Sequence, residues 1–158
     1  MSIKLSHLPL RLATGVFLVN SGMTKLSVAE EEAKQLQGLA AGSLPFVGEV
    51  SPTLFGRGLA ITELVLGGAL LAPLVPAGVA GAGLGAFSGG LLWLYVKTPG
   101  MHEEASLRPT PQGIVVAKDV WMAGIACSLV IDDLGRRLRR LLGGSKRQPS
   151  RSVQSRSG

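Results

Sequence analysis

Glu63 is a carboxylate near the middle of an apolar segment that extends from Leu54 to Leu74. In a helix it would lie about 13 Å from the start of a segment about 30 Å long, which is the thickness of the hydrocarbon core of a bilayer. A charged side chain at that depth costs at least about 2.5 kcal/mol, so it usually faces other helices and finds a partner or takes up a proton. Glu63 is therefore the first candidate for a functional group.

Lysines supply the candidate partners for Glu63. Lys118 stands near the start of the last apolar segment and is the first choice, and Lys25 at the end of the first segment is the second. Arg11 and Asp119 complete the polar residues that we assign to the same candidate pocket. Asp119 follows Lys118 directly, so in a helix the two side chains would point about 100° apart. Two interpretations stay open for this pocket: a structural ion pair that orders the helices, and a ligand or proton site.

A stripe of small and basic residues marks one face of the first apolar segment. Its members recur at alternating spacings of four and three, which places them on one side of a helix: Arg11, Gly15, Leu18, Gly22 and Lys25. Glycine in such a stripe permits close contact with a neighbouring helix. In the alternative interpretation, the two basic side chains simply extend to opposite surfaces of the membrane.

Several kinds of chemistry are excluded or disfavoured by composition. Cys127 is the only cysteine, which rules out an intramolecular disulfide, a C-x-x-C redox pair and a thiolate metal cluster. The histidines, His7 and His102, belong to opposite faces of the expected topology, so we expect no metal site. A redox role would therefore need an external cofactor or partner.

Four apolar segments predict an all-α protein, an integral membrane four-helix bundle in one domain of residues 1–133. The expected helices cover about residues 8–26, 54–74, 77–96 and 113–131, each long enough to span a bilayer. Arg11 interrupts the first segment, so we interpret it as a retained helix rather than a secretory signal. With both termini in the cytoplasm, ten Lys and Arg residues lie on the inner side and six on the outer side, which favours this orientation.

Three shorter features of the sequence add detail to the expected membrane bundle. Residues 28–39 predict a surface helix in the first outer loop, ending near Gly42. The third segment carries glycines four residues apart, for packing within the bundle or for homo-oligomerisation: Gly81, Gly85 and Gly89. Aromatic residues near the outer ends of the last two helices are typical of a membrane-interface belt: Trp93, Tyr95 and Trp121.

The net charge of +6 at pH 7 comes from the tail, residues 134–158, which has eight basic residues and no acidic ones. Its first part, LGRRLRRLL, predicts a short amphipathic helix lying on the inner leaflet, and the residues from about Gly143 onward are expected to be disordered. Arginines of the amphipathic part are the candidates for binding anionic lipid: Arg136, Arg137, Arg139 and Arg140. We expect no nucleic-acid partner.

Two of these segments together suggest a family. RLATGVFLVNSGMTKL, from Arg11 to Leu26, resembles the opening helix of DoxX-like membrane proteins, including the ending Gly22, Met23, Thr24, Lys25, Leu26. GLAITELVLGGALLAP, from Gly58 to Pro73, is similar to the second helix of that family, with Glu63, Gly67, Gly68 and Leu71 in the matching places of an E-x-x-x-G-G-x-x-L pattern. The resemblance covers residues 8–131 and leaves the tail outside it.

This resemblance implies a four-helix integral membrane protein of a bacterial cytoplasmic membrane with a redox-related role. We expect the chain to be the membrane subunit or anchor of an assembly linked to quinones or to oxidative or thiol stress, with a soluble or membrane oxidoreductase as partner. One alternative is a quinone-interacting subunit, in which Glu63 handles a proton and Lys25 or Lys118 polarises a quinone carbonyl. Another is a small-solute or proton pathway. No cofactor is identified from the residues, and we do not expect this chain to be an enzyme by itself.

Overall fold

The computed structural model describes residues 5–27, 30–103, 106–111, 113–117 and 119–143. Within these ranges the chain is all-helical and contains no strand, which confirms the predicted all-α class. The elements are η1 (Leu5–His7), α1 (Leu8–Leu26), α2 (Glu30–Ala41), η2 (Pro45–Glu49), α3 (Pro52–Leu71), α4 (Ala77–Lys97), α5 (Ile114–Ala117) and α6 (Val120–Gly143), where η1 and η2 are short 3₁₀ helices.

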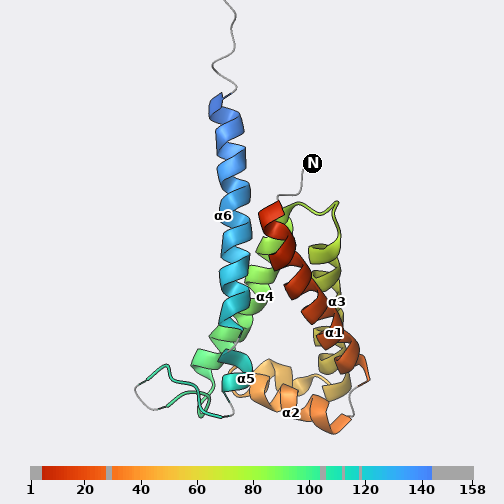
Figure 1. The fold of residues 1–158 in the computed structure, drawn as a ribbon. Coiled ribbons are helices and arrows are strands. Elements are labelled where there is room, and N and C mark those ends of the chain that lie inside the picture. The colour runs from red at the N-terminus through yellow and green to blue at the C-terminus, as the bar shows by residue number, and fades with distance from the viewer. Residues whose placement is uncertain (1–4, 28–29, 104–105, 112, 118, 144–158) are drawn as a thin grey trace, which may run out of the picture.

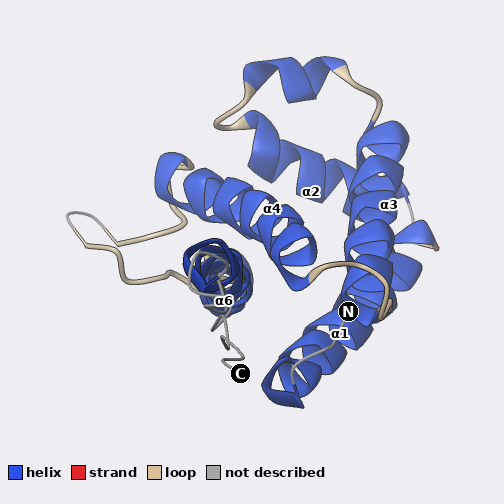
Figure 2. Cartoon of the chain, turned by 90° about the horizontal axis from the view of Figure 1, so that it is seen from above, coloured by secondary structure: helices blue, strands red, loops and turns tan. Residues whose placement is uncertain are grey.

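The long helices form two pairs. α1 packs along α3 and α4 packs along α6, whereas α3 and α4 share few contacts although a short turn joins them (Figure 1). Seen from above, α6 stands beside α4 while α1 lies across the molecule beside α3 (Figure 2). α2 crosses one end of the molecule, and the start of α1 and the α3–α4 turn lie at the other end.

Proline decides where α3 begins and ends. Ser51 caps the helix by accepting a hydrogen bond from the Leu54 backbone N–H, and Pro52 occupies the first position, where no N–H is needed. The helix ends at Leu71 rather than at the predicted residue 74. The reason is that Pro73 disfavours helical backbone at Ala72, which is extended with φ −70° and ψ 119°.

Glycine brings α1 and α3 into backbone contact. A Cβ atom at Gly67 would lie 2.8 Å from the Gly15 carbonyl oxygen, and one at Gly22 would lie 2.8 Å from the Ala60 carbonyl oxygen. The predicted stripe on α1 is buried against α3 at Arg11, Gly15, Leu18 and Gly22. Helices without side chains at these points can approach more closely than larger residues would allow.

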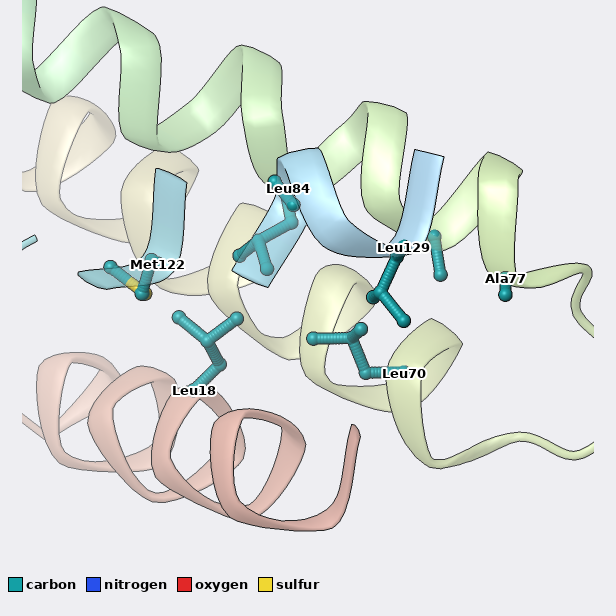
Figure 3. Packing of buried hydrophobic residues seen from close by; sticks show 8 residues of the cluster. Leu18, Leu70, Ala77, Leu84, Met122 and Leu129 are labelled. Carbon is teal, nitrogen blue, oxygen red and sulfur yellow. The ribbon is translucent and has the colours of Figure 1, made fainter. Parts of the chain in front are cut away.

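Glycine also allows α4 and α6 to pack closely. A Cβ atom at Gly81 would lie 2.8 Å from Leu129 Cβ, and one at Gly85 would lie 3.4 Å from Ala126 Cβ. Gly89 has no such neighbour within 4 Å. The first two glycines of the predicted motif therefore serve packing within the molecule. Between the two helix pairs, a buried apolar cluster closes the centre (Figure 3): Leu18, Leu70, Ala77, Ala80, Leu84, Met122, Ala126 and Leu129.

The last predicted helix differs most from the structure. Instead of one helix over residues 113–131, the chain forms the single turn α5 and then the 24-residue α6. The amphipathic segment after Asp133, expected as a separate helix on the membrane surface, continues α6 without a break and projects beyond the other helices (Figure 1). Gly135 follows the last apolar turn but adopts helical backbone rather than a cap conformation, and no proline follows it within α6, so the helix continues to Gly143. Residues 144–158, which we expect to be disordered, lie outside the described residues.

The end of the molecule that carries α2 is held by hydrogen bonds to backbone carbonyls. Gln37 Nε2 donates to the carbonyls of Val47 and Val50 in the connection after α2, and the Tyr95 hydroxyl donates to the Leu107 carbonyl. α2 confirms the predicted surface helix. Tyr95 is buried, so it does not belong to an exposed aromatic belt, whereas Trp93 and Trp121 are exposed.

His102 joins two parts of the loop after α4. Its ring nitrogens lie 3.1 Å from the Glu103 carbonyl and 3.2 Å from the Val96 carbonyl. Both carbonyls favour the protonated ring, Glu103 more strongly, and raise the pKa of His102 above its usual value.

Among the helices that the structure describes, α3 and α4 are long and apolar enough to cross a membrane. Only 28% of the most apolar part of each is buried within the molecule. Exposed apolar side chains project from both helices, among them Leu54, Ile61, Val65 and Val79. A helix in the core of a water-soluble protein would bury most of this surface, so membrane association is the natural explanation.

Adjacent glycines of α3 provide a test of the α1–α3 contact. Gly67→Ala should lower the stability of the protein in detergent by about 1–3 kcal/mol, because the new methyl group meets the α1 backbone. Gly68→Ala is the matched control, since nothing lies within 4 Å of its added Cβ atom and alanine favours helix by up to about 1 kcal/mol. The measurement is thermal unfolding of both variants. Equal melting temperatures would contradict the close contact.

Candidate functional site

The buried carboxylate of α3 forms an ion pair with the last lysine of α1. Lys25 Nζ lies 3.0 Å from both Glu63 Oε1 and Oε2, and it also donates to Ser21 Oγ at 2.6 Å. The Glu63 side chain is 8% exposed and the Lys25 side chain 21% exposed. All three ammonium protons therefore have an acceptor, and the carboxylate has a counter-charge inside the helix pair.

The helix geometry explains why these two residues meet. Gly22 lies three residues before Lys25 and Ala60 three residues before Glu63, so each residue shares a helix face with the contact point of its own helix. Because the absence of a side chain at Gly22 lets the Ala60 carbonyl come close, both charged groups are within hydrogen-bonding distance. Ser21 lies one turn before Lys25 and provides the third acceptor.

This arrangement is closed rather than open to chemistry. A general base or a nucleophile must present a lone pair to a substrate, whereas the Glu63 carboxylate is paired with Lys25 through both oxygens and its side chain is only 8% exposed. The pair can hold two helices in register, and its more exposed member, Lys25, is the group that an incoming polar ligand could reach.

Arg11 serves another end of the same helix pair. Its guanidinium donates to four backbone carbonyls at the end of α3 and in the following turn: Ala69, Leu70, Ala72 and Val75. The last carbonyls of a helix have no hydrogen-bond partner within the helix and carry the negative end of its dipole. A buried arginine there donates hydrogen bonds to the carbonyls and places a positive charge beside the dipole. Leu70 is seven residues from Glu63, about 10 Å along α3. Arg11 thus has its own contacts, separate from the Lys25–Glu63 pair.

The other two predicted pocket residues stand at the start of α6. Asp119 is buried, and its backbone carbonyl accepts from the N–H groups of Met122 and Ala123 at the first turn of α6. Lys118, which we expected to be the first partner of Glu63, lies outside the described residues. The structure brings the second candidate, Lys25, to Glu63.

A second buried contact was not anticipated from the sequence. His7 Nε2 lies 2.8 Å from Asp132 Oδ2, and His7 is almost completely buried. It joins the start of α1 to α6 at the end of the molecule where the α3–α4 turn lies. The sequence did contain a signal for this contact. His7 directly precedes the first apolar segment and Asp132 directly follows the last one, and the expected topology places these two ends on the same membrane face.

The candidate lipid-binding arginines all lie on the projecting part of α6. Arg136 Nη2 and Arg137 Nε pair with Asp133 at 3.1 and 2.9 Å, one helical turn away. Arg139 and Arg140 are exposed. The four arginines therefore form a basic surface that starts where the bundle ends.

Side chains that could bind a metal ion do not cluster in the part of the chain that the structure describes. No group of three or more His, Cys, Asp or Glu side chains lies close enough together there to hold a metal ion. Cys127 is exposed on α6.

A double-mutant cycle tests the Lys25–Glu63 pair. Lys25→Met and Glu63→Gln should each destabilise the protein, by about 3–5 kcal/mol where the remaining charge stays ionised and unpaired. The double variant should be more stable than the sum of the two losses predicts, because no unpaired charge is left. Thermal stability in detergent is the readout. Strictly additive effects would show that the two groups do not interact.

Lys97→Met is the control for loss of a lysine, since Lys97 is exposed at the end of α4. It should leave stability within about 0.5 kcal/mol of the parent protein. A loss as large as that of Lys25→Met would show that the assay reports net charge rather than the buried pair.

Comparisons with known proteins do not extend this description: no family model, no curated protein and no solved structure matches the chain.

Proposed function

We propose that the chain is an integral membrane protein of the DoxX-like type, in which α1, α3, α4 and α6 all cross the bilayer. The exposed apolar surface of α3 and α4 carries this proposal. α1 and α6 support it, since they also expose large apolar side chains: Leu12, Val16 and Met23 on α1, and Val120 and Ile131 on α6. On α1, Lys25 is held by Glu63 and Arg11 by the α3 carbonyls, as bundle-facing charges are.

Both termini face the cytoplasm in this proposal, and the membrane is a bacterial cytoplasmic membrane. The sequence supports the orientation, because it assigns ten Lys and Arg residues to the side of the two termini and six to the other side, and positive residues are retained on the inner side. The exposed arginines of α6 would then contact anionic head groups of the inner leaflet.

Cysteine labelling tests the orientation. With Cys127→Ser as background, a cysteine at Ser150 should react with a membrane-impermeant maleimide only after the cells are opened. A cysteine at Glu49, which is exposed at the α2 end, should react in intact cells. The reverse pattern would overturn the orientation, and protection of both cysteines until the cells are opened would overturn membrane insertion.

Within the membrane, we propose that this chain is the subunit or anchor of a redox-related assembly rather than its catalyst. The single observation that carries this choice is the closed Lys25–Glu63 pair, in which both oxygens of the buried carboxylate accept from the ammonium group. Such a pair maintains a rigid helix pair. The redox assignment itself comes from the resemblance of the Arg11–Leu26 and Gly58–Pro73 segments to DoxX-like proteins.

Co-purification tests the anchor function. The tagged protein, extracted in mild detergent, should retain an oxidoreductase in fixed stoichiometry, identified by mass spectrometry. An unrelated four-helix membrane protein with the same tag, expressed to the same level, is the control. The absence of any specifically retained protein would contradict the anchor role.

A quinone-interacting subunit is the second candidate, favoured by the greater exposure of the Lys25 side chain compared with Glu63. The Lys25 ammonium group, at the edge of the pair, can donate a hydrogen bond to a quinone carbonyl, which then takes the place of the Ser21 hydroxyl as acceptor. Lipid extracts of the same preparations distinguish the two candidates. A quinone that is retained by the parent protein and lost in Lys25→Met would support this second function over the first.

A further inference from the structure

One face of α6 is exposed along its whole length and repeats with the period of a coiled coil. Seven positions recur at spacings of four, three, four, three, four and three residues: Val120, Gly124, Cys127, Ile131, Leu134, Leu138 and Leu141. All seven are exposed, and five of them are large apolar residues that are 50% to 76% exposed. We call these seven residues the α6 seam. A seven-residue apolar repeat over more than three heptads is the pattern of a helix that packs against another helix.

The opposite face of α6 is already used. Met122, Ala126 and Leu129 are buried and face α4 and the central cluster. These residues have the same seven-residue spacing but lie half a turn away from the seam. α6 is therefore a helix with two packing faces, of which the molecule itself covers one.

Lipid could cover most of the seam but not its last turn. Asp133 lies level with the start of α4, because a Cβ atom at Gly78 would be 2.5 Å from Asp133 Oδ2. Leu141 is eight residues further along α6, about 12 Å beyond this level. The head-group layer of one leaflet is only about 5–7 Å thick, so in the proposed membrane placement the last turn of the seam extends into water.

We propose that the α6 seam is a dimer interface, and that its partner is the α6 seam of a second copy of this chain. Insertion in one orientation makes the two α6 helices parallel, which is the arrangement that a symmetric two-stranded coiled coil requires. Gly124 and Cys127 are small and permit close approach at membrane depth, while the leucines interlock beyond the membrane. The seam thus combines a membrane contact with a short leucine zipper.

Charge is compatible with self-association. None of the seven seam residues is charged, and the arginines of this region lie outside the seam. In a parallel pair Arg137 would flank Leu142 of the second copy rather than another arginine, and its guanidinium is already paired with Asp133. The seam therefore brings together no like charges.

The size of the seam sets the strength of the dimer. α6 is about 36 Å long and 10–12 Å wide, so each copy would contribute a footprint of about 400 Å². The total of about 800 Å² is smaller than the 1,200 Å² or more of stable interfaces between soluble proteins. We therefore infer a reversible dimer whose population rises with the protein-to-lipid ratio.

The native cysteine provides the first test. Because symmetric parallel pairing places Cys127 opposite Cys127, mild oxidation with copper phenanthroline in membranes should produce a disulfide-linked dimer from the unmodified protein. The matched control is Ala82→Cys in a Cys127→Ser background, an exposed position on α4 in the same apolar region. No dimer from the native protein, or as much dimer from the control, would overturn the proposal.

Substitution in the projecting leucines provides the second test. Leu134→Gln with Leu138→Gln should raise the dissociation constant and lower Cys127 cross-linking by about tenfold at low protein-to-lipid ratio. Phe46→Gln with Leu107→Gln is the control, because it replaces two equally exposed apolar side chains outside α6, and it should change cross-linking less than about twofold. Equal effects of the two pairs would exclude the leucines from the interface.

A third measurement does not depend on the folding of the glutamine variants. In the Cys127→Ser background, a cysteine at Leu141 should form a disulfide dimer, whereas a cysteine at Arg140 should not. A Leu141 cysteine that forms no dimer, and whose attached fluorophore shifts its emission when anionic lipid is withdrawn, would assign this face to lipid and overturn the dimer. Since these assays read self-association alone, their outcome is independent of whether a redox partner co-purifies.

Discussion

The close approach of α1 and α3 is the constraint on which the rest of the structure depends. Gly15, Gly22 and Gly67 place backbone against backbone, at distances where even one methyl group would meet a carbonyl oxygen. Two polar contacts follow from this spacing: Lys25 reaches Glu63, and Arg11 reaches the carbonyls at the end of α3. With larger residues in these places the helices would separate, and the buried charges would lose their partners.

The same physical problem explains why the charges of α1 lie where they do. An apolar environment does not hydrate an ion, so a buried charge is stable only beside an opposite charge or several hydrogen-bond acceptors. Lys25 meets the requirement with a carboxylate and a hydroxyl, and Arg11 meets it with four carbonyls. The contacts of Lys25 and Arg11 link α1 to α3 at two different positions along the helix axes. Together they set the register of this helix pair, while His7 and Asp132 connect its end to α6.

The pair formed by α4 and α6 leaves more of its apolar surface exposed. α4 covers only one side of α6, and the apolar cluster around Leu84 and Leu129 joins the pairs at the centre. What remains exposed on α6 is an apolar heptad stripe next to a basic surface. The part of α6 that projects beyond the bundle thus has two exposed sides available for contacts outside the molecule. The leucine side is suited to packing against protein, and the arginine side is suited to anionic head groups.

Periodicity and hydropathy in the sequence were sufficient for the all-helical class, the extent of α1, the helix α2 and the buried stripe of α1, because these depend on local backbone preference and on which residues avoid water. Proline chemistry moved the end of α3, and the uninterrupted helix after Asp133 replaced the expected surface segment. The identity of the buried partner was beyond sequence reasoning. Both Lys25 and Lys118 were candidates in the sequence. The contact of Gly22 with Ala60 brings the Lys25 ammonium to Glu63, because ion pairing requires atoms within about 4 Å and that distance is set by tertiary packing.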